Sequence, residues 1–148
     1  MTGEPTDASA RTGEARLLEW LAARRDADDA AAATTEVEVV EWATDALRRV
    51  CPIVTGLLAF DGRLAAEVTA QLRRGEHPGS ISEWGLGFAS RLESDADPWI
   101  SWAAQVDAGT LVVERSRGRA GAGSDAKCPG DPIRAVLLIN AGTDPRSE

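Results

Sequence analysis

Several residue types that catalytic and metal sites commonly use are scarce in this chain. Its 148 residues include no tyrosine, one histidine and two cysteines. The histidine, His77, lies in a predicted loop, and Cys51 and Cys128 occur in unrelated segments, so the spacing of a zinc site is missing. A nucleophile signature such as G-x-S-x-G is missing as well. We therefore expect no catalytic residues, no metal and no cofactor, and the sequence leans away from an enzyme.

Long apolar runs are also missing. No segment approaches the roughly 18 apolar residues that span a bilayer, and the polar start MTGEPTDASARTGE lacks the basic and apolar regions of a signal peptide. We therefore predict a cytoplasmic protein with reduced cysteines. Acidic residues outnumber basic ones by 24 to 16, for a net charge of −8. This charge disfavours nucleic acids and anionic membranes as partners, because both repel a negative protein.

The most extended apolar periodicity runs through residues 34–75. Its apolar residues recur at steps of three and four, which predicts amphipathic helices. Thr35 and Glu38 have the spacing of a capping box at the first helix start. Pro52 favours a second start, because proline fits the first turn of a helix and not its interior. Two or three such helices would bury their apolar faces together and form a helical core.

Helix signals continue on both sides of this stretch. Thr12 is the expected N-cap of a first helix, and Asp61 is the expected N-cap of the helix that ends before Gly75. Ser80 opens a further helix, and Asp97 followed by proline predicts a strong start for a short helix that ends at Gly109.

The last third of the sequence has a different texture. The segments TLVVE (110–114) and IRAVLLIN (133–140) are rich in β-branched and aliphatic residues, which predicts two strands. A Gly-rich segment, residues 115–132, separates them. The predicted fold class is therefore α+β and mostly α. A bundle of four to six helices is followed by a C-terminal antiparallel β-hairpin (110–140) with a long Gly-rich loop. We expect one domain over residues 12–141, between a flexible leader (1–11) and a flexible tail (142–148).

The Gly-rich segment has two conceivable uses. Its sequence GRAGAGSDAK lacks the order of a phosphate-binding loop and is followed by no predicted helix, so a nucleotide site is disfavoured. Arg115, Arg117 and Arg119 give the segment local positive charge on an acidic chain, which favours docking of an acidic partner. An aromatic residue for stacking on bases is missing, which argues against RNA.

Tryptophan is the one abundant aromatic residue, with five copies against two phenylalanines. Most are expected in the core, because each buries a large apolar area. Trp42 falls off the apolar stripe of its helix, and Trp99 lies close to Trp102 on one short helix. Tryptophans at the edge of a core often anchor partners. We therefore predict partner-binding roles for Trp42 and Trp99, together with the three arginines.

The leading functional hypothesis is a non-catalytic cytoplasmic interaction protein. It would be a small accessory or assembly subunit that binds a protein partner or itself through apolar helix faces, edge tryptophans or the hairpin. The alternative is a small-molecule-binding protein or small enzyme with a Trp-lined pocket between helices. A cavity lined by Trp84, Phe88 or Trp102 would favour the alternative, and exposed flat tryptophans would favour the interaction protein. DNA binding by a winged helix-turn-helix fits the order of elements but conflicts with the charge.

Overall fold

The computed structural model describes residues 5–23, 36–74, 78–116 and 128–147, and every regular element within these ranges is a helix. The elements are α1 (Pro5–Ala23), α3 (Glu36–Val50), α4 (Pro52–Phe60), α5 (Leu64–Leu72), α6 (Ile81–Leu92), α7 (Pro98–Ser116), α8 (Pro132–Asn140) and the short 3-10 helix η1 (Pro145–Ser147). No helix in the described ranges has both the length and the apolar character needed to cross a membrane.

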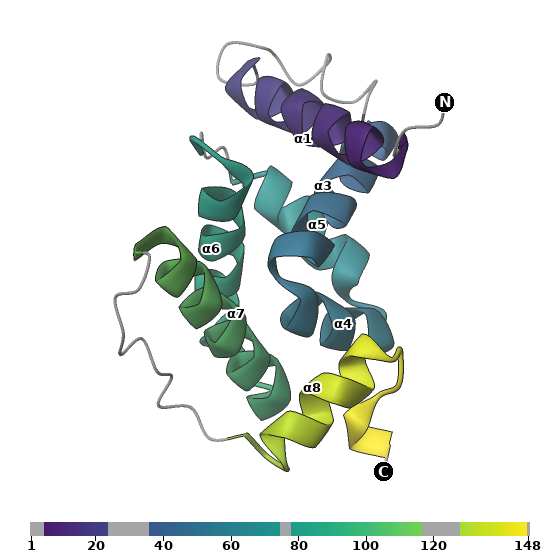
Figure 1. The fold of residues 1–148 in the computed structure, drawn as a ribbon, viewed down its shortest axis with the longest axis vertical. Helices are drawn as coiled ribbons and strands as arrows, with labels where there is room; N and C mark the ends of the chain where they lie inside the picture. The colour runs from purple at the N-terminus through teal and green to yellow at the C-terminus, as the bar shows by residue number, and fades with distance from the viewer. Residues whose placement is uncertain (1–4, 24–35, 75–77, 117–127, 148) are drawn as a thin grey trace.

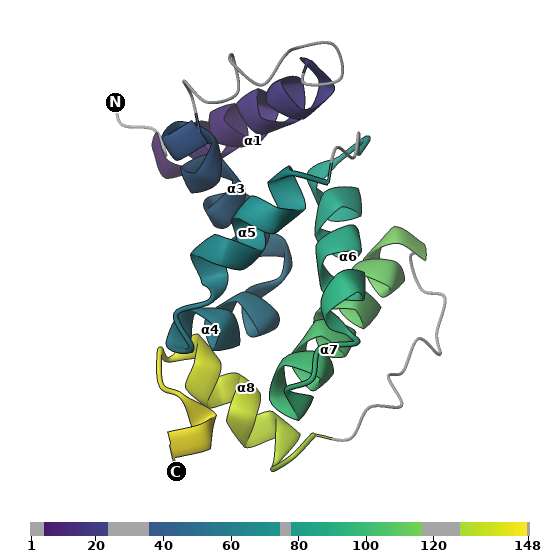
Figure 2. The ribbon, with the colours of Figure 1, turned by 180° about the vertical axis from the view of Figure 1, so that it is seen from behind.

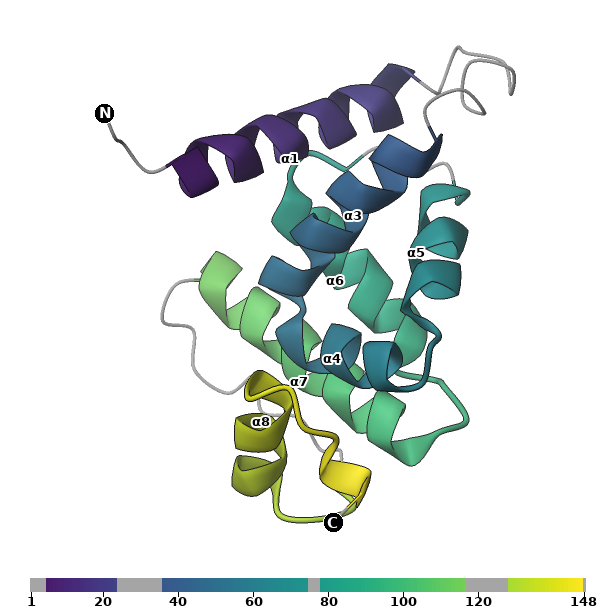
Figure 3. The same cartoon turned by 90° about the vertical axis from the view of Figure 1, so that its right-hand side faces the viewer.

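The helices are distributed along the long axis of the molecule, with α1 at one end and α8 at the other (Figure 1). α1 packs on α3, and α3, α4 and α5 follow one another through the middle of the molecule (Figure 3). α6 and α7 lie side by side, α6 against α3 and α7 against α4 (Figure 2). α8 closes the far end by packing on α4, with η1 beside it.

α4 is the centre of the core. Its sequence PIVTGLLAF is apolar around the whole helix, and such a helix is stable only when it is covered on all sides. Val54, Leu57 and Leu58 are accordingly fully buried. At Gly56 the backbone lies so close to α8 that an added methyl group would sit 2.5 Å from Ile139 Cγ2. The glycine therefore allows α8 to pack directly on α4.

Three helix starts expected from the sequence are confirmed. Pro52 occupies the first turn of α4. The Ser80 hydroxyl accepts a hydrogen bond from the Glu83 N–H at 3.1 Å, and Asp97 Oδ1 accepts one from the Trp99 N–H at 2.9 Å. These side chains satisfy backbone donors that a helix leaves unpaired at its first turn.

Two other boundaries differ from expectation. α1 begins at Pro5, earlier than the start expected at Thr12. α5 begins at Leu64, and Asp61 does not cap it but forms an ion pair with Arg146 at 2.8 Å. The pair ties η1 to the turn between α4 and α5. The capping box expected at residues 35–38 starts at a position outside the described residues.

The predicted C-terminal β-hairpin is wrong, and with it the α+β fold class. No strand occurs in the part of the chain that the structure describes. Residues 110–114 form the last part of α7, and residues 133–140 form most of α8. The helical bundle itself is present, but the described residues hold seven α-helices and not four to six. Of the Gly-rich segment, residues 117–127 lie outside the described ranges.

The physical reason lies in how the aliphatic residues are spaced. Leu111 continues the buried face of α7 and is 2% exposed, so the helix runs on past Gly109. Ala135 and Ile139, four residues apart, are buried on the inner face of α8. The Asp131 carboxylate caps that helix by accepting a hydrogen bond from the Ile133 N–H at 3.0 Å. β-Branched residues tolerate a helix when its packing and its cap favour it, because strand propensity is a weak preference.

Candidate functional site

Trp42, one of the two tryptophans predicted to bind a partner, is engaged within the chain. It is half-buried between α3 and α1. Its ring lies next to Gly13, where an added methyl group would be 3.5 Å from Trp42 Cδ1. The Arg16 guanidinium sits over the ring, 5.8 Å from its centroid, which is cation–π distance. In this structure Trp42 therefore holds α1 on α3.

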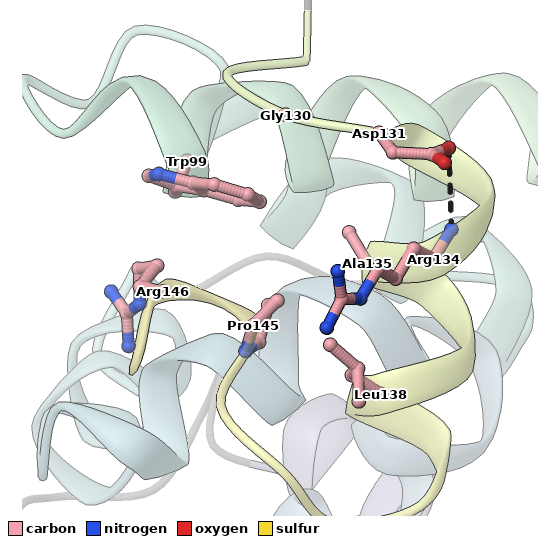
Figure 4. A pocket seen from close by; sticks show the side chains of 8 residues that line it. All are labelled: Trp99, Gly130, Asp131, Arg134, Ala135, Leu138, Pro145 and Arg146. Atoms are coloured by element: carbon pink, nitrogen blue, oxygen red, sulfur yellow. Dashed lines mark hydrogen bonds between the residues drawn. The ribbon is translucent and has the colours of Figure 1, made fainter. Parts of the chain in front are cut away.

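Trp99, the second of these tryptophans, forms one wall of a pocket. Its ring meets Trp102 edge to face, with centroids 5.9 Å apart. The pocket has a volume of about 310 Å³, and Figure 4 shows the indole on one side with Arg134 and Pro145 opposite. We call it the Trp99 pocket; its lining consists of Trp99, Gly130, Asp131, Arg134, Ala135, Leu138, Pro145 and Arg146.

Two charged groups of the Trp99 pocket, Asp131 and Arg146, already stabilise the fold. Asp131 caps α8, and Arg146 pairs with Asp61 and with Asp144, whose carboxylate lies 2.9 Å from Arg146 Nε. The hydrogen bonds from Arg146 lower the pKa of Asp144. A ligand here would compete with these pairs for the same groups. The pocket is thus a hollow beside a structural ion cluster.

Of the three arginines in the predicted docking segment, one lies within the described residues. Arg115 lies exposed in the last turn of α7. Arg117 and Arg119 lie outside the described residues. Their proposed contact with an acidic partner stays a prediction.

A second pocket lies where the end of α3, the start of α4, α7 and α8 meet. Its volume is about 330 Å³. We call it the Asp107 pocket; its lining consists of Arg49, Val50, Pro52, Ile53, Val106, Asp107, Thr110, Glu114 and Val136. A pocket with mainly apolar walls and a few converging polar groups has the usual character of a small-molecule site.

Asp107 is buried because α4 needs a cap that its own first residues do not supply. Cys51 occupies the N-cap position but makes no capping bond with its side chain. Its thiol donates instead to the Gly85 carbonyl at 3.3 Å. Asp107, which comes from α7, accepts from the Val54 N–H at 2.8 Å and also from the Ile53 N–H. A carboxylate from a distant helix thus satisfies two donors at the start of α4.

This position changes the acidity of Asp107. The residue is only 3% exposed, and loss of hydration raises the pKa of its carboxyl to about 7. The hydrogen bonds from Val54 and Ile53 act in the opposite direction, but burial dominates. Charged and neutral forms are therefore both populated near neutral pH. A strongly perturbed carboxyl in a pocket is a recognised mark of a functional site.

The neighbouring thiol does not add a nucleophile. Cys51 and Cys128 are both free, and Cys51 is fully buried. Burial, and to a lesser extent the charge of Asp107, raises the pKa of the Cys51 thiol far above its ordinary value. The thiol therefore stays protonated, whereas a catalytic cysteine needs its thiolate. His77 lies outside the described residues. Among those described, no group of three or more His, Cys, Asp and Glu side chains is placed to hold a metal ion.

The remainder of the lining is aliphatic with a charged rim. Val50, Pro52, Ile53, Val106 and Val136 supply the walls. At the rim, Arg49 forms an ion pair with Glu14 of α1, and Glu114 is exposed on α7. Because Glu14 offsets Arg49, the two carboxylates of the lining leave the pocket with an excess of negative charge.

Asp107 was not among the predicted site residues, although the sequence contains a signal for it. Ile100, Ala104, Asp107 and Leu111 follow one another at steps of four, three and four, and all are buried on one face of α7. An acid within such a stripe indicates a buried carboxyl that requires a partner. The sequence does not reveal that the partner is α4. Trp84, Phe88 and Trp102, which would line a cavity under the alternative hypothesis, are buried in the core and line neither of these two pockets.

Comparison with protein-family models, with curated proteins and with solved structures found no match to this chain in any of the three.

Proposed function

We propose that this is a non-catalytic cytoplasmic protein that binds a small molecule in the Asp107 pocket. The single observation that carries the proposal is the buried Asp107 carboxyl at an aliphatic pocket where four helices meet. A buried carboxyl in apolar surroundings is unfavourable unless it is well paired. Its role as a cap accounts for its place in the fold, and the pocket beside it offers the carboxyl to a ligand.

A fragment titration followed by two-dimensional NMR tests this function. Small organic fragments should shift the amide signals of Ile53 and Val136, which line the pocket, and of Val54, whose N–H is bonded to Asp107. Thr110→Trp should block the pocket and abolish these shifts, since Thr110 lines it and is exposed enough to accept a large side chain. Val112→Trp, an exposed position on the same helix, is the matched control and should leave binding intact. Fragments that bind Thr110→Trp as well as the unaltered protein would exclude this pocket.

A second candidate function, self-association, is favoured by one further observation. Ile133 and Leu137 lie one turn apart on α8 and are 73% and 63% exposed, while Ala135 and Ile139 on the opposite face are buried. Contiguous exposed apolar patches mark contact surfaces between protein chains, and these two side chains form a small one on α8. The sequence suggested three kinds of interaction surface: apolar helix faces, edge tryptophans and the hairpin. The exposed pair on α8 supports the first of them. In this proposal α8 packs on α8 of a second copy.

Light scattering coupled to size exclusion tests self-association. A dimer should have twice the 15.6 kDa of one chain. Leu137→Glu should then convert it to a monomer, whereas Val37→Glu, at a 76% exposed position on α3, should not. A monomer at every concentration would remove this candidate.

A further inference from the structure

Resting on the ligand-binding function proposed above, we propose that the Asp107 pocket takes an aliphatic ammonium ion. Its alkyl body packs on the valine and isoleucine walls, and its charged nitrogen is bound by the carboxylate of Asp107. The chemical class of the ligand follows from three features of the lining: the kind of polar groups, their remaining capacity to accept hydrogen bonds, and their charge.

The polar groups of α7 that line the pocket form a row of hydrogen-bond acceptors. Asp107, Thr110 and Glu114 follow at steps of three and four, which places them on one face of the helix. The Thr110 hydroxyl donates its proton to the Val106 carbonyl at 3.0 Å, so its oxygen is left to accept. The row leads from the exposed Glu114 to the buried Asp107. Acceptors in this arrangement match a ligand that carries several N–H donors.

Asp107 has capacity for such a donor. A carboxylate can accept about four hydrogen bonds. The N–H groups of Val54 and Ile53 provide two of them. An ammonium ion at the pocket side would add a charge-assisted hydrogen bond, which is among the stronger polar contacts in proteins. It would also compensate the charge of a carboxylate that is otherwise unfavourable to bury.

The same geometry disfavours an anionic ligand. A helix N-terminus ordinarily attracts anions, but the carboxylate of Asp107 already occupies the N-terminus of α4. Glu114 adds a second negative charge at the rim, and Arg49 is paired with Glu14. A ligand carboxylate or phosphate would meet repulsion at both ends of the pocket. A neutral ligand gains from the aliphatic walls alone.

The test is an NMR titration with three probes of equal chain length: n-hexylammonium, 1-hexanol and hexanoate. At pH 8 hexylammonium should bind at least about tenfold more tightly than hexanol, and hexanoate should not bind, since one charge-assisted hydrogen bond contributes about 1.5–3 kcal/mol. Asp107→Asn should remove the advantage of the ammonium and leave hexanol unchanged. Glu114→Gln should weaken the ammonium about two- to threefold, as expected of an exposed charge. Glu38→Gln, an exposed acid on α3, is the matched control and should have no effect.

A second measurement covers the case in which Asp107→Asn does not fold. With the unaltered protein, hexylammonium should bind about tenfold more weakly at pH 6 than at pH 8, because only about a tenth of the Asp107 carboxyl is then ionised. The other ionisable groups around the pocket are Arg49 from α3, Cys51 before α4 and Glu114 on α7, and α8 contributes the uncharged Val136. Hexanol should show no such dependence on pH.

The outcomes separate the two proposals. Equal affinity for hexanol and hexylammonium at both pH values, with shifts at Val54, would overturn the ammonium ligand and keep the ligand-binding function. Preference for hexanoate would do the same. Binding of none of the three probes, and of no fragment, would count against both.

Discussion

The N-termini of α4 and α8 are each capped by an aspartate, but one aspartate is distant in sequence and buried, and the other is local and exposed. Asp131 directly precedes α8, is exposed, and accepts from the Ile133 N–H at 3.0 Å. Asp107 comes from another helix, is buried, and accepts from the Val54 N–H at 2.8 Å, 53 residues away. Both satisfy the same kind of orphan donor. The local cap leaves its carboxylate in water, whereas the distant cap places a carboxyl in the interior, raises its pKa and puts it at a pocket.

The largest difference between the two caps should appear when each side chain is removed. Asp107→Ala leaves two buried N–H donors without an acceptor and opens a cavity, so we expect a loss of about 2–4 kcal/mol in the free energy of unfolding. Urea denaturation followed by circular dichroism measures this. A loss no greater than that of Asp131→Ala would mean that the buried cap adds nothing to stability beyond an exposed one.

The pH dependence of stability should also distinguish the caps. The native state keeps the Asp107 proton up to pH about 7, while the unfolded chain releases it near pH 4. The native state therefore binds more protons between these values, and its stability should fall as the pH rises from about 4 to 7. Asp107→Asn should remove this slope, as shown by urea denaturation at a series of pH values.

Two other acids bound to arginines act in a different range. Hydrogen bonds from Arg63 and Arg146 lower the pKa values of Asp95 and Asp144. Their contribution to stability is therefore lost below about pH 4 and does not overlap the Asp107 window. A slope between pH 4 and 7 that persists in Asp107→Asn would assign it to other groups.

The smallest of these effects is expected at the local cap. Asp131→Ala should lower the free energy of unfolding by about 1 kcal/mol, the usual effect of losing an exposed N-cap. Asp131→Asn should restore most of this loss, since asparagine caps about as well as aspartate. The same urea experiment measures both. If Asp131→Ala were to unfold the protein, the docking of α8 would depend on its cap far more than an exposed side chain explains.

The two caps also show how far the sequence predicts this fold. Local signals predicted the helix start correctly where a proline or a capping side chain lies within four residues of its helix, as at Pro52, Ser80 and Asp97. The pair Asp131-Pro132 carries the same signal as the pair at Asp97. The aliphatic residues that follow this pair favour a strand more strongly than the pair favours a helix start. The predicted hairpin is wrong for this reason.

The candidate site could not be predicted from the sequence, for a different reason. Its apolar walls come from α3, α4, α7 and α8, and the partner of Asp107 is a backbone group 53 residues earlier. Periodicity along a helix predicts which face is buried, but it does not identify the element that covers this face. The roles predicted for Trp42 and Trp99 depended on the same missing information, because their neighbours on α1 and beside α8 are set by tertiary packing.

The long separation between Asp107 and α4 has a consequence for the order of folding. α4 has nine residues, too few to be stable alone in water. Its first turn lacks a local cap, so it gains full protection only when α7 docks. We expect the amides of Ile53 and Val54 to acquire protection from hydrogen exchange late in refolding, together with those of α7. Among the described helices, the one with the largest buried share would then be among the last to be completed.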